Sequence, residues 1–213
     1  MGCDIHMFVE KYNNNTKNWE SVGKKFPDDN VIHTIMKFME HHLGTSYEES
    51  GELINKFLKG EEPKTKFEYH ILKVFLPQEV PMEDDGSNWW GNEGKLSYPF
   101  TREPYIGRNY NLFGALGNVR NYDTEKAVAW ERGLPDDVSD DICSLSDDWG
   151  VDSHSHNHLY LDELIDSKYY KMTEEELDES GLGTGFFNKT IDNILNFVDA
   201  DPEDIRIVFW FDN

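Results

Sequence analysis

The sequence predicts a single α+β domain in which the first and last strands share a central sheet and helices pack around it. Residues 3–10, CDIHMFVE, form a short run with strand-like alternation. The closing residues 205–212 are almost continuously apolar, which suits a strand buried on both faces. Amphipathic helical patterns lie between these two runs, and this order is typical of an α+β domain.

The first strand carries two different faces. Ile5, Met7 and Val9 point to one side, whereas Asp4, His6 and Phe8 point to the other, because alternate residues of a strand share a face. The polar residues 13–18, NNNTKN, predict a turn, and the following NWESVG predicts a returning strand. The chain therefore starts with a β-hairpin.

A helical insertion is predicted over residues 28–76. Asp28 or Asp29 can cap a helix over about residues 30–43, and a second helix covers 48–58 and stops at Gly60. Residues 64–76 are apolar and interpreted as β-rich. The region as a whole could be an inserted piece of the single domain.

Turns and helices are predicted for the remaining chain. Residues 77–107 are turn-rich, and Trp89 and Trp90 favour an ordered loop that covers a site. Apolar periodicity then predicts helices in four segments: NYNLFGALGNVRN (109–121), SDDICSLSDDW (139–149), LYLDELIDS (159–167) and residues 185–198.

The composition and net charge limit which classes of molecule are expected to bind this protein. The 213 residues carry a net charge of −22, which disfavours binding to DNA or anionic membranes. A well-solvated acidic surface is the preferred interpretation of this charge, and a basic protein partner and mimicry of nucleic acid are the alternatives. No membrane-spanning run or signal peptide is recognised. Only Cys3 and Cys143 are present, so we expect no disulfide framework and a cytoplasmic location.

Histidines mark the candidate site. In an extended HSHNH segment, His154, His156 and His158 would share one face, and Asp4 and His6 would do so in the first strand. Histidine transfers protons near neutral pH and binds metals, so these residues predict a site that performs chemistry or holds a ligand.

Arginine placement predicts an anion pocket. Four of the five arginines fall within 31 residues: Arg102, Arg108, Arg120 and Arg132. Arg108 precedes a helix that begins near Asn109, where backbone N–H groups and the helix dipole favour an anion. The alternative is that these arginines pair with carboxylates and hold loops together.

An ordered set of segments resembles a widespread, uncharacterised family of small phage and bacterial proteins. The segments are MGCDIH, RNYNLFGALGNVRN, RGLPDDVS, WGVDSHS with the following LxLDEL, and the terminal RIVFWFDN. The resemblance implies a phage or prokaryotic cytoplasmic context and no particular activity. Its pattern covers Cys3, Asp4, His6, Arg108, Tyr110, Arg120, Arg132, Asp152, His154 and Ser155, but neither His156 nor His158.

Three chemistries fit these residues. A divalent metal such as zinc or manganese could be held by His154, His156 and His158, with Asp4, His6 or Asp152 completing the shell. Alternatively, His6 and His154 could cleave a phosphodiester as acid and base, with Asp4 or Asp152 orienting an imidazole and arginines stabilising the phosphate. Binding without turnover is the third.

The preferred interpretation is cleavage of a phosphodiester in a small nucleotide, and cyclic signalling nucleotides are among the candidate substrates. Contacts to the bound ligand are expected from Arg108, Asn109, Tyr110, Arg120, Arg132 and Ser155. The two alternatives are a protein that sequesters a host signalling nucleotide and an acidic mimic of nucleic acid that inhibits a host protein. Cys3 is disfavoured as a nucleophile because neighbouring acidic groups would raise its pKa.

Overall fold

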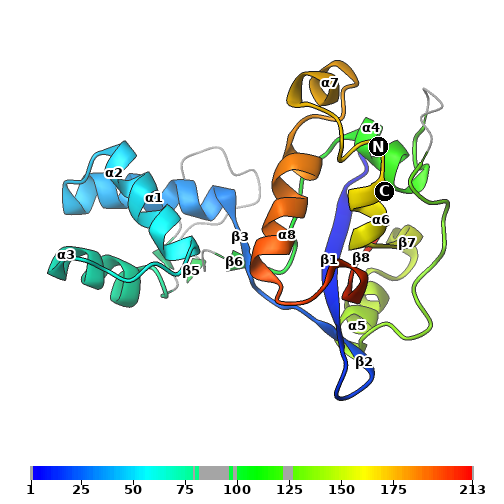
Figure 1. The fold of residues 1–213 in the computed structure, drawn as a ribbon, viewed down its shortest axis with the longest axis horizontal. Helices are drawn as coiled ribbons and strands as arrows, with labels where there is room; N and C mark the ends of the chain where they lie inside the picture. The colour runs from blue at the N-terminus through cyan, green and yellow to red at the C-terminus, as the bar shows by residue number, and fades with distance from the viewer. Residues whose placement is uncertain (1, 79, 82–95, 98–99, 122–126, 213) are drawn as a thin grey trace. The chain divides into compact units, whose positions relative to one another are not determined.

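The chain folds around a four-stranded antiparallel sheet, which confirms the α+β class (Figure 1). The computed structural model describes residues 2–78, 80–81, 96–97, 100–121 and 127–212. The strand order is β2-β1-β8-β7, with bounds Asn18–Ser21, Ile5–Asn13, Ile205–Phe211 and His154–Tyr160 respectively. The first and last long strands are therefore neighbours in one sheet, as predicted.

The register brings three distant segments to one end of the sheet. Phe211 of β8 pairs with Ile5 of β1 on one side and with His154 of β7 on the other. Because β8 is antiparallel to both neighbours, β1 and β7 begin where β8 ends (Figure 1). The residues that flank these strand ends, including Asp4 and Asp212, consequently meet at one edge.

Helices cover both faces of the sheet. The face that carries Ile5, Met7 and Phe209 packs against the main core, to which α4, α6, α7 and α8 contribute. The opposite face carries Phe8 and Trp210 and packs against α5. The bounds are α4 Tyr110–Gly117, α5 Asp140–Trp149, η2 Gly150–Asp152, α6 Leu161–Asp166, α7 Glu174–Glu179, η3 Gly185–Thr190, α8 Ile191–Phe197 and η4 Pro202–Asp204.

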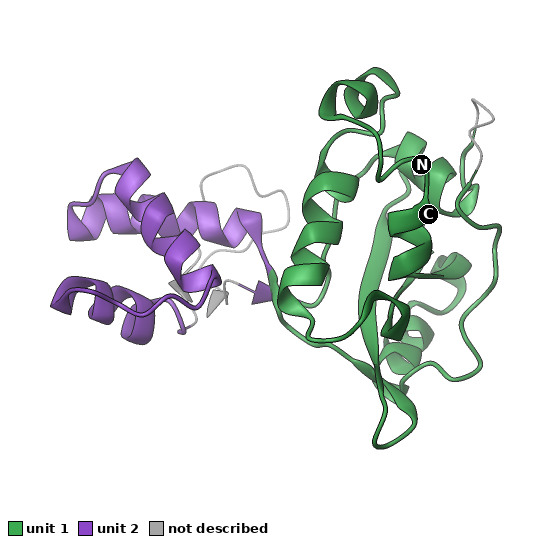
Figure 2. Cartoon of the chain, viewed as in Figure 1, with its two compact units in different colours: residues 1–26, 102–213 green, residues 27–101 purple. Residues whose placement is uncertain are grey.

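Residues 27–101 form a compact unit of their own, which interrupts a unit made of residues 1–26 and 102–213 (Figure 2). This inserted unit contains the expected segment 28–76 and extends beyond it, and it has its own apolar core. Its elements are α1 Asp29–Leu43, α2 Tyr47–Leu58, α3 Lys66–Tyr69, the π-helical η1 His70–Phe75, β4 Val80–Pro81 and β5 Leu96–Ser97; β3 Phe26–Pro27 and β6 Phe100–Thr101 lie at its ends.

The β-rich interpretation of residues 64–76 is wrong, because this segment is helical from Lys66 to Phe75. The Thr65 side chain accepts a hydrogen bond from Glu68 N and so starts the helix. Ile71, Leu72 and Leu76 then fall on one helical face and enter the core of the inserted unit. Trp89 and Trp90 lie outside the described residues.

No helix among the described residues has the length and apolar character needed to cross a membrane.

Candidate functional site

Asp212, which follows the last strand, forms hydrogen bonds to Asp4, which precedes the first strand. Its Oδ1 accepts a hydrogen bond from Asp4 N at 2.6 Å, and its own N–H donates to Asp4 O at 3.1 Å. Its second carboxylate oxygen, Oδ2, lies 3.4 Å from His6 Nε2. One carboxylate therefore holds both the backbone of Asp4 and the imidazole of His6.

His6 lies in a partly buried setting with carboxylates on both sides. Its Nδ1 is 3.8 Å from Glu103 Oε1, and its ring lies against Trp149 of α5 with centroids 4.0 Å apart. Its side chain is 15% exposed. Burial opposes the charged form, but Glu103 and Asp212 outweigh burial and raise the pKa of His6 above 6.5. His6 therefore holds a proton more readily than a free imidazole does.

The Asp4 carboxylate forms an ion pair with Arg108 and does not contact His6 as predicted. Arg108 Nε and Nη2 donate to the two Asp4 carboxylate oxygens at 2.6 Å and 2.5 Å. This bidentate pairing lowers the pKa of the Asp4 carboxyl. Asp4 was expected to orient His6, and Asp212 fills that position instead. We call Asp4, His6, Glu103, Arg108 and Asp212 the strand-end cluster.

The histidines of β7 do not share a face, so the expectation of three aligned ligands is wrong. The ladder between β7 and β8 is irregular between His154 and Asn157, and Ser155 adopts a left-handed backbone with φ of 51°. This bulge places one extra residue on the strand and reverses the alternation after it. His154 stacks on Phe211, whereas His156 lies against Trp210, the next residue of β8 on its opposite face.

Each of these histidines has a separate environment. His154 Nδ1 lies 3.1 Å from Ser155 Oγ, His156 Nε2 lies 2.8 Å from Ser146 Oγ, and His158 Nδ1 lies 3.0 Å from Gly133 O. Burial lowers the pKa of His156. Within the described ranges, no group of three His, Cys, Asp or Glu side chains is arranged to hold a metal ion.

The arginines do not all converge on one pocket: Arg108 and Arg120 both lie near the first residues of the chain, where they contact Asp4 and Cys3, but Arg102, Arg132 and Arg206 pair with carboxylates elsewhere. Arg102 pairs with Asp141, Arg108 with Asp4, Arg132 with Glu163, and Arg206 with Glu10 and Asp137. Arg132 makes two hydrogen bonds to Glu163 at 2.8 Å and 2.7 Å. These contacts match the alternative that arginine–carboxylate pairs hold loops together.

Residues around α4 have mainly structural contacts. The Asn109 side chain caps α4 by accepting from Leu112 N and donates to Gly181 O and Leu182 O. The Arg120 guanidinium lies 5.0 Å from the centre of the Tyr110 ring. Arg120 also hydrogen-bonds the Cys3 thiol, yet burial dominates and raises the pKa of Cys3.

Asp152 does not join His6 or His154. It is exposed in η2, and no hydrogen bond or ion pair in the described part of the chain links it to either histidine. Ser155 contacts His154 and forms the bulge in β7.

Two members of the cluster, Asp212 and Glu103, and its neighbour Trp149 were not predicted as site residues. Asp212 could have been found, because pairing the last strand antiparallel to the first places the residue after Phe211 beside Asp4. Glu103 falls in a turn-rich segment without periodicity, and Trp149 ends a helix, so neither carried a local signal.

Comparisons of the chain with protein-family models, curated proteins and solved structures give no match, so function is inferred from the geometry alone.

Proposed function

We propose that the strand-end cluster binds a small phosphorylated ligand, such as a nucleotide, and cleaves a phosphodiester in it. The observation that carries this proposal is the setting of His6: the imidazole is held between Glu103 and Asp212, and its pKa is raised. An imidazolium in this state is a suitable general acid at neutral pH.

Arg108 supplies the contact to phosphate. Its side chain is 52% exposed, and its only strong partner among the described residues is the half-exposed Asp4. A guanidinium matches phosphate oxygens with the same two-pronged geometry that it uses for Asp4. A bound phosphate therefore accepts hydrogen bonds from the Arg108 N–H groups that donate to Asp4 in the free protein.

The residues then divide the reaction between them. Water attacks phosphorus, and the Glu103 carboxylate accepts a proton from that water. The bond from phosphorus to the leaving oxygen breaks, and His6 gives its proton to that oxygen. Asp212 orients the imidazole, and Arg108 stabilises the charge that develops on the phosphate oxygens.

A second candidate function is retention of the nucleotide without cleavage. Trp149 favours it, because this residue is partly exposed and its ring lies against His6 at a tilt of 35°. In this function the exposed Trp149 indole holds a base by stacking, and Arg108 of the cluster holds the phosphate. In this case the same cluster would bind ligand and release it intact.

The test is incubation of the protein with a panel of cyclic and linear nucleotides, with and without EDTA, followed by mass spectrometry of the products. Cleavage that persists in EDTA and is lost in His6→Asn supports the proposal. The matched control is His154→Asn, because His154 is a partly buried histidine on the other face of the sheet. Recovery of only intact bound nucleotide favours retention, and absence of binding to every nucleotide excludes both functions.

A further inference from the structure

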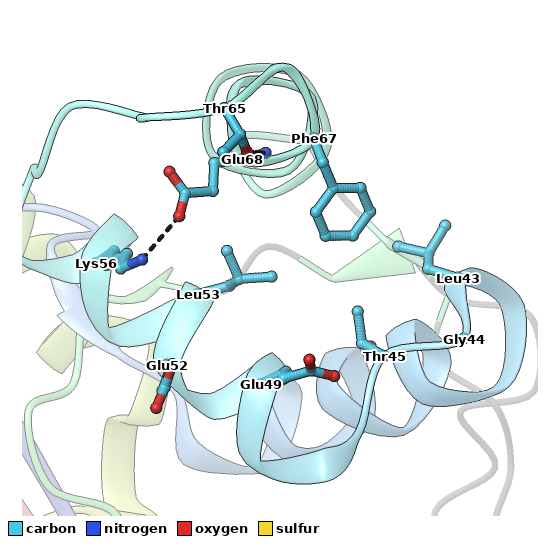
Figure 3. Close-up of a pocket in the computed structure, with 10 residues that line it drawn as sticks. All are labelled: Leu43, Gly44, Thr45, Glu49, Glu52, Leu53, Lys56, Thr65, Phe67 and Glu68. Carbon is cyan, nitrogen blue, oxygen red and sulfur yellow. Dashed lines mark hydrogen bonds and ion pairs between the residues drawn. The ribbon is translucent and has the colours of Figure 1, made fainter.

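The inserted unit has a surface groove of about 370 Å³ between α2 and α3, closed at one end by the residues that follow α1. Figure 3 shows Phe67 projecting from α3 toward Leu43, with Leu53 of α2 on the floor. Phe67 is 47% exposed and Leu43 is 38% exposed, whereas Leu53 is buried. Two large apolar side chains thus border a slot that is open to solvent.

Carboxylates surround this slot. Glu49, Glu52 and Glu68 line the groove, and Lys56 is the one cationic side chain among the described residues that line it. Lys56 Nζ donates to Glu68 Oε1 at 2.8 Å, so the lysine charge is already compensated (Figure 3). The groove is therefore net negative, which disfavours nucleic acid and anionic lipid and complements cationic side chains.

The walls of the groove are preformed. Ser46 and Glu49 exchange hydrogen bonds in a capping box at the start of α2, and Thr65 caps α3. Beneath them, the core of the inserted unit packs Ile54 against residues of α1 and η1. Binding in such a groove costs little ordering of the backbone, because helix positions are already fixed.

We propose that this groove docks a basic, amphipathic segment of another protein. An apolar side chain of that segment enters the slot between Leu43, Leu53 and Phe67, and its Lys or Arg residues lie near Glu49 and Glu52. A second copy of this chain is a poorer occupant, because each copy carries a net charge of −22 and like-charged proteins repel.

The experiment measures binding of a fluorescent synthetic helix of Leu and Lys residues to the full chain by anisotropy, at physiological ionic strength. The control peptide replaces each Leu by Ser and keeps the charge. We expect Phe67→Ala to weaken binding of the Leu–Lys helix about tenfold, as at other apolar anchor sites. Glu52→Lys should also weaken binding, because it reverses a charge in the lining.

Tyr69→Ala is the matched control variant, because Tyr69 is an exposed aromatic on the same helix, 58% exposed, and outside the groove lining. Circular dichroism checks that each variant is folded. The proposal is overturned by absence of binding, by equal affinity for the Ser peptide, or by equal effects of Phe67→Ala and Tyr69→Ala. Sedimentation that reveals a dimer abolished by Phe67→Ala would instead assign the groove to a second copy.

Discussion

His6 and His154 lie on opposite faces of the central sheet, although their strands flank the same strand, β8. His6 pairs across the ladder with Trp210 and packs under α5, whereas His154 pairs with Phe211 and stacks on it. The backbone of the sheet separates the two rings. Direct proton exchange through one ligand is therefore excluded for this pair, and the proposed reaction assigns acid–base catalysis to His6 and its carboxylates.

The raised pKa of His6 predicts how stability depends on pH. Because the folded-state pKa lies above 6.5, the charged form contributes stability that is fully present below about pH 6.5 and is lost as pH rises through the folded value. We expect wild type to exceed His6→Asn in free energy of unfolding at about pH 5.5 by more than at about pH 8.5. Urea denaturation at both values measures this, and a difference that grows with pH would contradict it.

Arg206 is predicted to be the arginine on which stability depends most. It is 1% exposed, it donates from Nε to the fully buried Glu10, and it lies 4.0 Å from the Trp19 ring centre. Arg206→Ala leaves a buried carboxylate without its partner and should lower the free energy of unfolding by about 3–5 kcal/mol. Denaturant unfolding checks this, and the double variant Arg206→Met with Glu10→Leu should recover most of the loss.

Ser155 is predicted to hold a strained backbone. Its φ of 51° lies in the left-handed region, which costs a residue with a Cβ roughly 1 kcal/mol or more. Ser155→Gly should stabilise the protein by up to about 1 kcal/mol. Ser153→Gly is the control, since its φ of −85° is ordinary and glycine there should destabilise. Thermal unfolding of both variants tests this prediction. A destabilised Ser155→Gly protein would show that the contacts of the serine side chain contribute more to stability than relief of the backbone strain does.

Arg108 is predicted to contact the phosphate of the ligand. Arg108→Ala should weaken nucleotide binding about tenfold or more, because a charge-assisted pair of hydrogen bonds is lost. Arg102→Ala is the matched control, because Arg102 is also a partly exposed arginine that pairs with a carboxylate, Asp141, outside the cluster. Calorimetric titration compares the two, and equal losses of affinity would remove the assigned role of Arg108.

Sequence periodicity was sufficient to predict most of the fold. Alternation placed Ile5, Met7 and Val9 on one face, and all three lie in the main core. Asp28, one of the two residues predicted as possible caps, caps α1. Residues 64–76 were misread because short apolar runs suit strands and helices alike, and the deciding contacts of Ile71 and Leu72 are tertiary.

The site was harder to predict because its geometry depends on distant partners. The alternation rule fails in HSHNH since the bulge at Ser155 arises from register with β8, and serine gives no local sign of a left-handed backbone. Arg108 and Asp4 are 104 positions apart, so their pairing cannot be read from spacing. The prediction that the first and last strands share a sheet did, however, place Asp4 and His6 in the same sheet as the final strand.

The turnover of His6→Asn, compared with wild type on a nucleotide that the protein cleaves, tests the central claim most directly. We expect turnover to fall by about 10²-fold or more while nucleotide affinity is largely kept, because a general acid is lost and Arg108 remains. His154→Asn should retain near wild-type turnover. Wild-type turnover in His6→Asn, or an equal loss in His154→Asn, would contradict the assignment of His6 as the proton donor.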